Sequence, residues 1–183
     1  GTMSTGQTLN FNHPVKELVW VAQDAVAATE GASGTENMDA TLNVPFPAVA
    51  SEKNDYFNYT NSAGPTETIN GVTSRESFTT MKLQLNGHDR FGVRKATYFR
   101  TCQPQQHGHK VPSKHIYSYS FALKPEEHQP SGTCNFSRID NAQMIFKNKI
   151  AGGGSIARNL SVYAVNYNVL RIMSGMGGLA YSN

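Results

Sequence analysis

The chain has 183 residues, of which 16% are charged and 38% hydrophobic, and its formal net charge is +3. This length suits a single domain that buries its own core, and the scattered, weakly basic charge argues against a nucleic-acid-binding protein. No apolar run approaches the roughly 20 residues that span a bilayer, and the N-terminus has no charged-then-apolar signal pattern. We therefore expect a protein that neither inserts into a membrane nor is secreted by its own signal.

The first apolar segments predict two strands of different character. Residues 9–12 are expected to form a short strand, whereas residues 18–22 (LVWVA) are apolar without alternation. In an antiparallel sandwich one face normally meets water, so a strand that is apolar on both faces needs a second cover. That cover is another domain, a long loop or a neighbouring subunit, and the alternative is a central strand under the protein's own loops. Leu18, Val19 and Trp20 are therefore candidate subunit-interface residues, with Trp20 equally suited to the core.

A long polar stretch follows, from residue 24 to residue 68, with glycines, prolines and short apolar fragments. Loops of this length inside a compact domain are usually functional or exposed insertions. We interpret residues 24–68 as a long exposed loop between strands, within one domain that covers residues 1–183.

Alternation of apolar and polar residues predicts the firmest strands in the rest of the chain. Three runs each place one set of apolar side chains on a single face: Met81, Leu83 and Leu85; Tyr117, Tyr119, Phe121 and Leu123; and Tyr163, Val165, Tyr167 and Val169. The first run stops at Asn86-Gly87, a favoured hairpin turn. Residues 134–139 and 142–146 are expected to be further strands.

One segment indicates a helix. Residues 93–102 place Ala96 and Phe99 three residues apart and Tyr98 and Cys102 four residues apart, which are helical spacings. We expect this helix to end before Gln103-Pro104, because a proline disfavours its continuation.

The remaining segments are expected to be connections. Residues 103–114 are expected to form a loop that carries histidines, and residues 174–178 are expected to form a glycine-rich tail. About seven short strands, long loops and one short helix predict an all-β fold, an antiparallel β-sandwich of the jelly-roll or another Greek-key type.

The segment LKPEEHQPSGTCNF, residues 123–136, gathers two carboxylates, a histidine and a cysteine. Consecutive residues of an extended chain point in different directions, so Glu126, Glu127 and His128 rarely converge on one atom without a partner from elsewhere. Two prolines bracket these charges, and Ser131-Gly132 offers the positive φ that a turn needs. We expect a turn between two strands.

Three histidines, His107, His109 and His115, are the best metal-ligand candidates. A structural zinc needs four ligands and a catalytic zinc three plus water, and no cysteine or carboxylate stands at motif spacing beside these histidines. We therefore expect a solvated loop, with no metal and no cofactor. The two cysteines, Cys102 and Cys134, are too few for a disulfide framework, and we expect free thiols.

Catalytic motifs are missing from the sequence. A cysteine nucleophile would need a histidine nearby in space, which the sequence leaves open, but Cys134 begins an alternating strand and is more simply a small buried residue. The chain has no GxSxG, phosphate-loop or HExxH motif, and SGMGGL at residues 174–179 follows the last strand instead of opening a helix. Arg90, Arg94 and Arg100 are expected to form salt bridges or to pack through their stems.

Four long motifs carry a family resemblance, together with Tyr98-Phe-Arg and the Gln103-Pro pair that follows it. In chain order they are LNFNHPVKELVWVAQ, LQLNGHDRF, IYSYSFALKPEEHQPSGTCNFSRIDNAQ and NYNVLRIMSGMGGLAYSN. This series closely resembles the C-terminal part of the major capsid protein of large icosahedral double-stranded DNA viruses, the group that includes iridoviruses, algal viruses and giant viruses of protists. The motifs cover most of the chain outside residues 24–68.

The resemblance implies a structural protein without enzymatic activity. Members of this family fold as two consecutive jelly rolls, and three copies form a pseudo-hexagonal capsomer, so this chain would supply much of the second jelly roll. The implied partners are further copies in a homotrimer, neighbouring capsomers and minor capsid proteins, with no direct contact to nucleic acid. The implied location is the virion capsid, reached after assembly in the host cytoplasm. In that setting Glu126, Glu127 and His128 would hold loop geometry or meet a neighbouring subunit.

The chain departs from the family in length, because the first jelly roll and the opening strands of the second should precede Leu9. It is expected to be a fragment of a longer polypeptide, or a short paralogue or split gene product whose missing strands come from another chain. Missing strands leave an unpaired edge and uncovered apolar surface, which predicts association.

Two other function classes stay open. A jelly-roll lectin would bind glycans through exposed aromatic residues, with Tyr56, Phe57 and Tyr59 as candidates. A cupin-like metalloenzyme would instead use His107 and His109 of the histidine loop.

Overall fold

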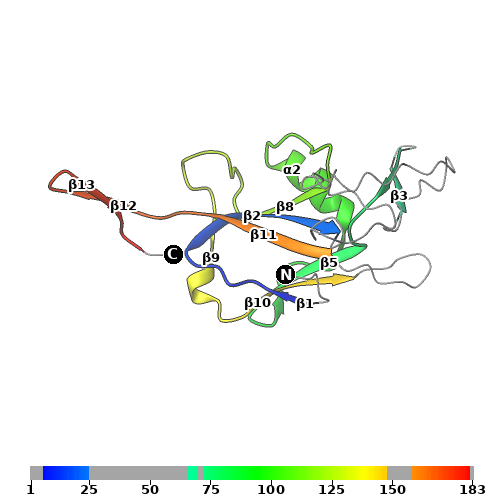
Figure 1. Cartoon of the computed structure of the whole chain (residues 1–183), viewed down its shortest axis with the longest axis horizontal. Helices are drawn as coiled ribbons and strands as arrows, with labels where there is room; N and C mark the ends of the chain where they lie inside the picture. The colour runs from blue at the N-terminus through cyan, green and yellow to red at the C-terminus, as the bar shows by residue number, and fades with distance from the viewer. Residues whose placement is uncertain (1–5, 25–65, 70–71, 148–157, 182–183) are drawn as a thin grey trace, which may run out of the picture.

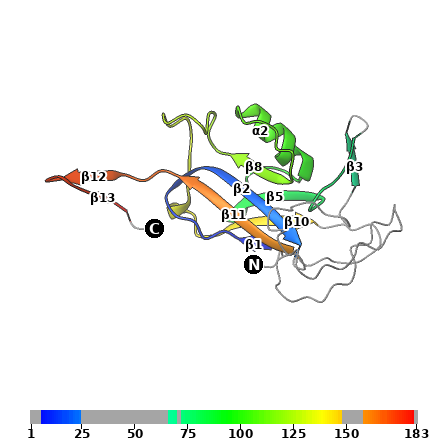
Figure 2. The ribbon, with the colours of Figure 1, turned by 45° about the horizontal axis from the view of Figure 1, so that its top comes forward.

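The computed structural model describes residues 6–24, 66–69, 72–147 and 158–181. Within these ranges the chain consists mostly of short antiparallel strands, so the all-β prediction is confirmed. Figures 1 and 2 show two layers of strands that face each other, a helical segment beside β8, and a hairpin that projects from the C-terminal end. No helix in the described ranges is long and apolar enough to span a membrane.

The first sheet has five strands in the order β1-β10-β5-β6, with β7 also paired to β5. Its members are β1 (Gly6–Thr8), β5 (Thr80–Leu85), β6 (His88–Asp89), β7 (Arg94–Lys95) and β10 (Ala142–Lys147). The alternation predicted for β5 and β10 is confirmed, since Met81, Leu83 and Met144 are buried on one face. Asn86-Gly87 turns β5 into β6 with φ values of 50° and 80°, the positive values that a two-residue hairpin turn requires.

The second sheet has four strands in the order β11-β2-β8, with β9 also paired to β2. Its members are β2 (Pro14–Asp24), β8 (Ile116–Ser120), β9 (Cys134–Asn135) and β11 (Arg158–Asn166). Strand β8 is shorter than the predicted run of residues 117–123. Its end has a local cause, because the Ser120 hydroxyl bonds both the backbone N–H and the carbonyl of Ala122 and so offers the backbone an alternative to the ladder.

An aromatic core joins the two sheets. Phe78 contacts Tyr117 of the second sheet and Phe146 of the first, with ring centroids 4.8 and 5.1 Å apart. Trp20 stacks on Tyr117 at 6.0 Å and meets Phe99 of the helical segment at 5.4 Å. All five rings are buried in one hydrophobic cluster, so the sandwich and its helix share a single core.

Strand β2 shows how the apolar run at residues 18–22 is covered. Leu18 and Trp20 are 0% exposed and lie in the core, whereas Val19 and Val21 are half-buried on the opposite face. The strand lies between β11 and β8, which agrees with the alternative of a central strand. Leu18 and Trp20 therefore belong to the core of the chain and not to its surface.

The helical segment continues through the proline that was predicted to stop it. A π-helical turn, η1 (Tyr98–Cys102), leads directly into α2 (Gln103–Gln106), so the predicted end before Gln103-Pro104 is wrong. Pro104 is tolerated because it falls in the first turn of α2, where an N–H is not needed. The side chain of Gln103 further fixes the segment, since it donates to Tyr98 Oη at 2.8 Å and accepts from the backbone N–H of Ser120 at 3.2 Å.

Two of the weaker predicted strands are displaced or shortened in the structure. The N-terminal strand is β1 and not residues 9–12, although the N–H of Leu9 still donates to the carbonyl of Ala142 at 2.8 Å. The predicted strand at residues 134–139 ends after β9, where η2 (Phe136–Arg138) forms a 3-10 turn. Asn135 causes this change, because its side chain accepts a hydrogen bond from the N–H of Ser137 at 3.1 Å and caps the turn.

Strand β11 buries the face opposite to the predicted one. Leu160 is buried and Val162 and Ala164 are half-buried against the core, whereas Tyr163 is 61% and Val165 40% exposed. Both faces of this strand carry apolar residues, so alternation with a period of two could not show which face is buried.

Two further hairpins complete the described chain. Strands β3 (Thr66–Ile69) and β4 (Val72–Arg75) pair with each other at the end of the segment expected to be a long loop. The rest of that prediction, residues 25–65, lies outside the described residues. At the C-terminal end, β12 (Leu170–Met173) and β13 (Met176–Leu179) form a hairpin where a glycine-rich tail was expected.

Candidate functional site

Exposed apolar side chains gather at the C-terminal end of the described chain. We call residues 169–181, which contain β12 and β13, the arm. Its large apolar side chains are 54–74% exposed, and they are Val169, Leu170, Ile172, Met173, Met176, Leu179 and Tyr181. Contiguous exposed apolar surface of this kind marks an interaction site more often than a free surface.

The arm is ordered by its own backbone. Ser174 and Gly175 turn β12 into β13 with φ values of 52° and 79°. At its base the N–H of Ala180 donates to the carbonyl of Val169 at 2.8 Å, and the Asn168 side chain donates to the carbonyl of Tyr181 at 2.9 Å. Strands β12 and β13 pair with each other and with no other strand among the described residues, and Figures 1 and 2 show the arm extending away from the sandwich.

The outward face of β11 lies next to the arm in the chain. We define this face as Ser161, Tyr163 and Val165, all of which are exposed. In the described part of the chain β11 pairs with β2 along one edge, and no described strand pairs with its other edge. An apolar face beside an unpaired strand edge is a surface that proteins normally cover.

A second site joins three segments through a histidine. His109 Nε2 lies 3.0 Å from Oε1 of Glu17 on β2, and Nδ1 of the same ring lies 3.4 Å from Oε1 of Glu126 in the loop between β8 and β9. The contact to Glu17 has an ion-pair distance but not the alignment of a hydrogen bond. Burial raises the pKa of Glu17, and the nearby His109 opposes that rise.

The Glu17–His109–Glu126 cluster has metal-ligand atom types within 4.8 Å of one another. The His109 ring turns opposite nitrogens toward the two carboxylates, whereas a metal ion could bind only one of those nitrogens. This geometry favours a contact that holds two segments together, which we call the His109 clamp, over a metal site. The two contacts lie on opposite sides of the ring and so join β2 to the loop between β8 and β9. The cluster therefore holds the loop of residues 123–133 against β2.

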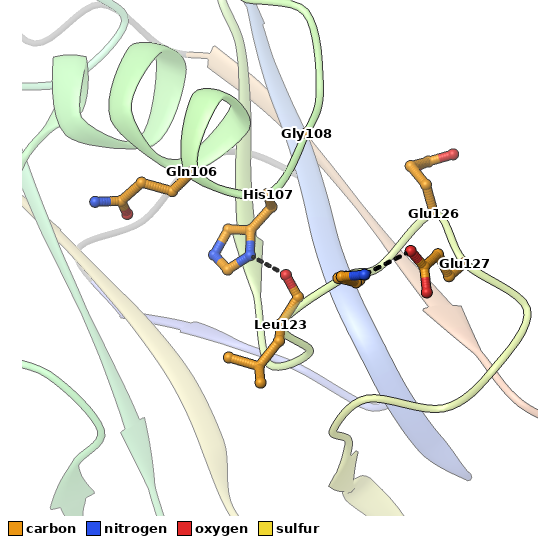
Figure 3. A pocket seen from close by; sticks show the side chains of 7 residues that line it. Gln106, His107, Gly108, Leu123, Glu126 and Glu127 are labelled. Atoms are coloured by element: carbon orange, nitrogen blue, oxygen red, sulfur yellow. Dashed lines mark hydrogen bonds and ion pairs between the residues drawn. The ribbon is translucent and has the colours of Figure 1, made fainter.

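A hollow of about 360 Å³ lies beside this cluster, and Figure 3 shows the side chains around it. Its lining residues come from the end of α2 and from the loop between β8 and β9: Gln106, His107, Gly108, Leu123, Lys124, Glu126 and Glu127. His107 Nδ1 lies 3.2 Å from the carbonyl oxygen of Leu123, and Lys124 pairs with Glu127 at 2.9 Å. The first contact joins the end of α2 to the loop between β8 and β9, and the second lies within that loop, so the hollow is a junction between two connected segments.

A third cluster is buried beside the helical segment. The Glu76 carboxylate is fully buried, and it accepts hydrogen bonds from Arg100 at 2.6 and 3.0 Å and from Tyr117 Oη at 2.9 Å. His115 Nε2 lies 3.9 Å from the same carboxylate, and neither ring nitrogen has a hydrogen-bond partner among the described residues. Burial lowers the pKa of His115, and the charge of Arg100 acts in the same direction against the opposing effect of Glu76. The cluster anchors the helix to the core.

The three histidines proposed as metal candidates do not meet. His107 faces a backbone carbonyl, His109 joins two carboxylates, and His115 is buried near Glu76. The histidine loop therefore gives no support to a cupin-like metalloenzyme. The lectin candidates, Tyr56, Phe57 and Tyr59, lie outside the described residues.

The cysteines behave as the sequence predicted, and among the three arginines Arg100 forms the predicted salt bridge. Cys102 and Cys134 are both free, and burial raises the pKa of the Cys134 thiol, which disfavours the nucleophilic thiolate. Arg100 forms a buried ion pair, and the guanidinium of Arg94 lies 5.6 Å from the ring centre of Tyr98.

The candidate interface residues fall into two groups. Leu18 and Trp20 are in the core and Val19 is half-buried, whereas Glu126, Glu127 and His128 are exposed in the loop between β8 and β9. The turn predicted for this loop is confirmed, with Gly132 at a φ of 144°. Sequence reasoning missed the arm, because its glycines were interpreted as a flexible tail. Apolar residues on both sides of the Ser174-Gly175 turn were the signal that could have identified a hairpin.

Comparison with known proteins gives one consistent family. Residues 2–178 match the family described as "Large eukaryotic DNA virus major capsid protein". The chain is 39% identical to the "Major capsid protein" of Phaeocystis pouchetii virus, over 100% of this chain and 46% of that protein. It is 41% identical to the "Major capsid protein" of Paramecium bursaria Chlorella virus 1, over 96% of this chain and 42% of that protein. The chain thus spans less than half the length of these relatives.

Solved structures agree with the sequence comparison. A chain of the "PBCV-1 virus capsid, quasi-atomic model" superposes with a TM-score of 0.64 and 35% identity, over 100% of this chain and 49% of that chain. The "Faustovirus major capsid protein" shares the fold with a TM-score of 0.56 at 14% identity, over 89% of this chain and 32% of that chain. These neighbours are viral jelly-roll capsid proteins, which confirms the predicted fold class.

Proposed function

Because the chain belongs to the family of large eukaryotic DNA virus major capsid proteins, we propose that it is a building block of an icosahedral capsid that acts through contacts between subunits. The observation that carries this proposal is the apolar surface formed by the arm and the outward face of β11. A protein that worked alone in water would not be expected to expose so many large apolar side chains in one region.

The finer features of the proposal come from the family resemblance. Three copies would form a pseudo-hexagonal capsomer, and capsomers would contact one another and minor capsid proteins in the virion shell after assembly in the host cytoplasm. A cyclic trimer uses the same pair of surfaces three times, so one apolar contact suffices to close the ring. The part of the family protein that this chain does not span would be supplied by a longer polypeptide or by a separate chain.

The loop of residues 123–133 is a second proposed contact. It presents Glu126, Glu127 and His128 at the surface, and the clamp of His109 holds it in place. Polar residues at the rim of an interface contribute mainly to orientation and specificity. Val19 is the one apolar candidate on β2 that is partly accessible, while Leu18 and Trp20 support β2 from the core.

The described polar clusters support a structural role over a catalytic one. The ion pair of Glu76 with Arg100 and the contacts of His109 with Glu17 and Glu126 each connect separate segments of the chain. Such connections fix the geometry of loops and helix, which a capsid subunit needs in order to fit its neighbours.

Sedimentation velocity over a concentration series tests the proposal. The 20.0-kDa chain is expected to form a discrete species of three times its mass as concentration rises. A chain that stays strictly monomeric at high concentration, with a well-dispersed NMR spectrum, would contradict the proposed assembly through exposed faces.

A further inference from the structure

We propose that the His109 clamp is a pH-dependent switch, which holds the tip of the loop between β8 and β9 when the clamp carries one added proton and releases the tip when that proton is lost. We define the tip as residues 126–130, which include Glu126, Glu127 and His128. The switch is a property of the single chain, and only its consequence for contacts between subunits rests on the proposed function.

The tip is attached to the rest of the molecule in a way that lets it move. All five of its residues are exposed, whereas the chain beside it is fixed by the buried Pro125 and by Gly132, which lies against the carbonyl of Phe121. Within the described residues, the contact of Glu126 with His109 at 3.4 Å is the one ion pair or hydrogen bond that joins the tip to a segment outside its own loop. Loss of that contact would free the tip without unfolding its base.

The geometry of the clamp requires a proton that a neutral histidine cannot supply. Nε2 of His109 lies 3.0 Å from Oε1 of Glu17, and Nδ1 lies 3.4 Å from Oε1 of Glu126. A neutral imidazole carries a hydrogen on one nitrogen and a lone pair on the other. If both carboxylates are ionised, either tautomer therefore turns a lone pair toward an acceptor oxygen. One added proton, on the ring or on a carboxylate, removes this repulsion.

The surroundings of Glu17 act in the same direction. Its side chain is 5% exposed, and its ladder partners, Ser120 on β8 and Val165 on β11, carry no charge. Burial raises the pKa of Glu17, and His109 opposes that rise. Because these groups interact closely, the added proton belongs to the clamp as a whole and not to one residue.

Other charged groups beside the clamp alter this balance only in part. Glu126 adds to the rise in the pKa of Glu17, and His107 opposes it. Lys124 and Glu127, which line the hollow, pair with each other at 2.9 Å, so their opposite charges offset one another. The groups that face the clamp from β2 and from the loop are therefore mainly acidic, which favours proton uptake in the closed state.

The direction of the switch follows from the proton count. The closed clamp holds up to one proton more than the released tip, so the ratio of released to closed molecules rises with pH by at most about tenfold per pH unit. At low pH the tip presents Glu126, Glu127 and His128 in a fixed position, which lowers the entropic cost of a contact with a neighbouring subunit. At higher pH the same residues are free to move.

Carbon-detected NMR relaxation of the tip tests the switch, because it does not depend on exchangeable amide protons. The unaltered chain is studied as a dilute monomer between about pH 5.5 and pH 8.5, the range around which histidine titrates. Order parameters of residues 126–130 are expected to approach about 0.85 at the acidic end and to fall toward about 0.6 at the basic end. Those of β5 and β10 should stay constant, which shows that the fold is intact.

Two substitutions remove the clamp from opposite sides. Glu126→Gln removes the charge that meets His109, and it should not impair folding because the Glu126 side chain is 69% exposed. His109→Gln removes the ring that titrates. In both variants the order parameters of the tip are expected to stay low at every pH. His88→Gln is the control, since His88 is exposed in β6, and it should keep the pH dependence of the unaltered chain.

Three results would overturn the inference. The first is a tip whose order parameters are the same across the pH range in the unaltered chain. The second is a pH dependence that persists in both Glu126→Gln and His109→Gln. The third is a pH dependence that disappears in His128→Gln, because the histidine of the tip itself would then be its cause.

Sedimentation velocity at the same pH values separates the switch from the proposed function. Association of the chain with a tip that does not respond to pH would contradict the switch and leave the capsid role standing. A tip that responds as expected in a chain that never associates would support the switch and contradict the proposed assembly.

Discussion

At the scale of single residues, Glu76 and Arg100 form a buried ion pair. The Glu76 side chain is 1% exposed, and Arg100 Nη2 lies 2.6 Å from its carboxylate. Removal of one partner leaves an uncompensated buried charge, which typically costs about 3–5 kcal/mol. We expect Arg100→Met to lower the free energy of unfolding by about that amount, as measured by urea denaturation.

The exposed pair of Lys82 and Asp89 provides the control. Its side chains are 25% and 44% exposed, and the Nζ–Oδ1 distance is 3.1 Å. Exposed pairs contribute about 0–1 kcal/mol, so Lys82→Met should have a small effect. Equal losses in the two variants would show that the carboxylate of Glu76 is not buried as described.

His115 gives the chain a specific dependence on pH. Burial holds its pKa below the usual value of 6.5, so the folded chain binds a proton less readily than the unfolded chain does. Stability from this group is present above about pH 6.5 and is lost as the pH falls toward the folded pKa, with a slope of at most about 1.4 kcal/mol per pH unit. We expect His115→Gln to flatten the fall in melting temperature between pH 7 and pH 5.

A second histidine variant separates this effect from general acid sensitivity. His88 is exposed in β6, and His88→Gln should leave the slope against pH unchanged. A slope that is the same in the unaltered chain and in the His115→Gln chain would contradict the assignment.

At the scale of elements, the loop between β8 and β9 depends on Gly132. Its φ is 144°, and a Cβ atom there would lie 2.8 Å from the carbonyl oxygen of Phe121. Both the backbone conformation and the close approach require glycine. We expect Gly132→Ala to lower the free energy of unfolding by about 1–3 kcal/mol, measured by chemical denaturation.

Gly92 is the matched control for this substitution. A Cβ atom at Gly92 would meet no atom within 4 Å, so Gly92→Ala should be close to neutral. A stable Gly132→Ala chain would mean that the loop, with Glu126 and Glu127, can take another path.

The strands show how far the sequence could predict the elements. Alternation identified β5 and β10 correctly, because polar residues separate their apolar positions. In β11 it selected Tyr163 and Val165 as buried, whereas the core receives Leu160 and Val162. A longer window would have shown two apolar faces, which is itself a signal that the outer face needs a cover.

Other features depend on contacts that no local pattern contains. Glu126 meets His109 and Glu17 only because three separate segments fold together, and their positions in the sequence show no ligand spacing. The helical segment continues through Pro104 because this proline lies in the first turn of α2, a position that the local sequence pattern did not reveal. The family motifs, by contrast, identified the capsid resemblance directly, since they depend on residue identity and not on geometry.

At the scale of the whole molecule, the described part of the chain is a β-sandwich with a buried aromatic core and an apolar extension. Trp20, Phe78 and Tyr117 join both sheets, so the sandwich is stabilised from within. The arm contributes exposed apolar surface and pairs with no described strand outside itself. Stability and assembly are therefore carried by different parts of the chain, the core and the arm.

Hydrogen–deuterium exchange at two protein concentrations tests the central claim, that the chain functions by burying its arm against another copy. Amides of residues 169–181 should exchange quickly in the dilute monomer and markedly more slowly at a concentration where the chain associates, while those of β5 and β10 stay protected throughout. Association that leaves the exchange of residues 169–181 unchanged would contradict the account.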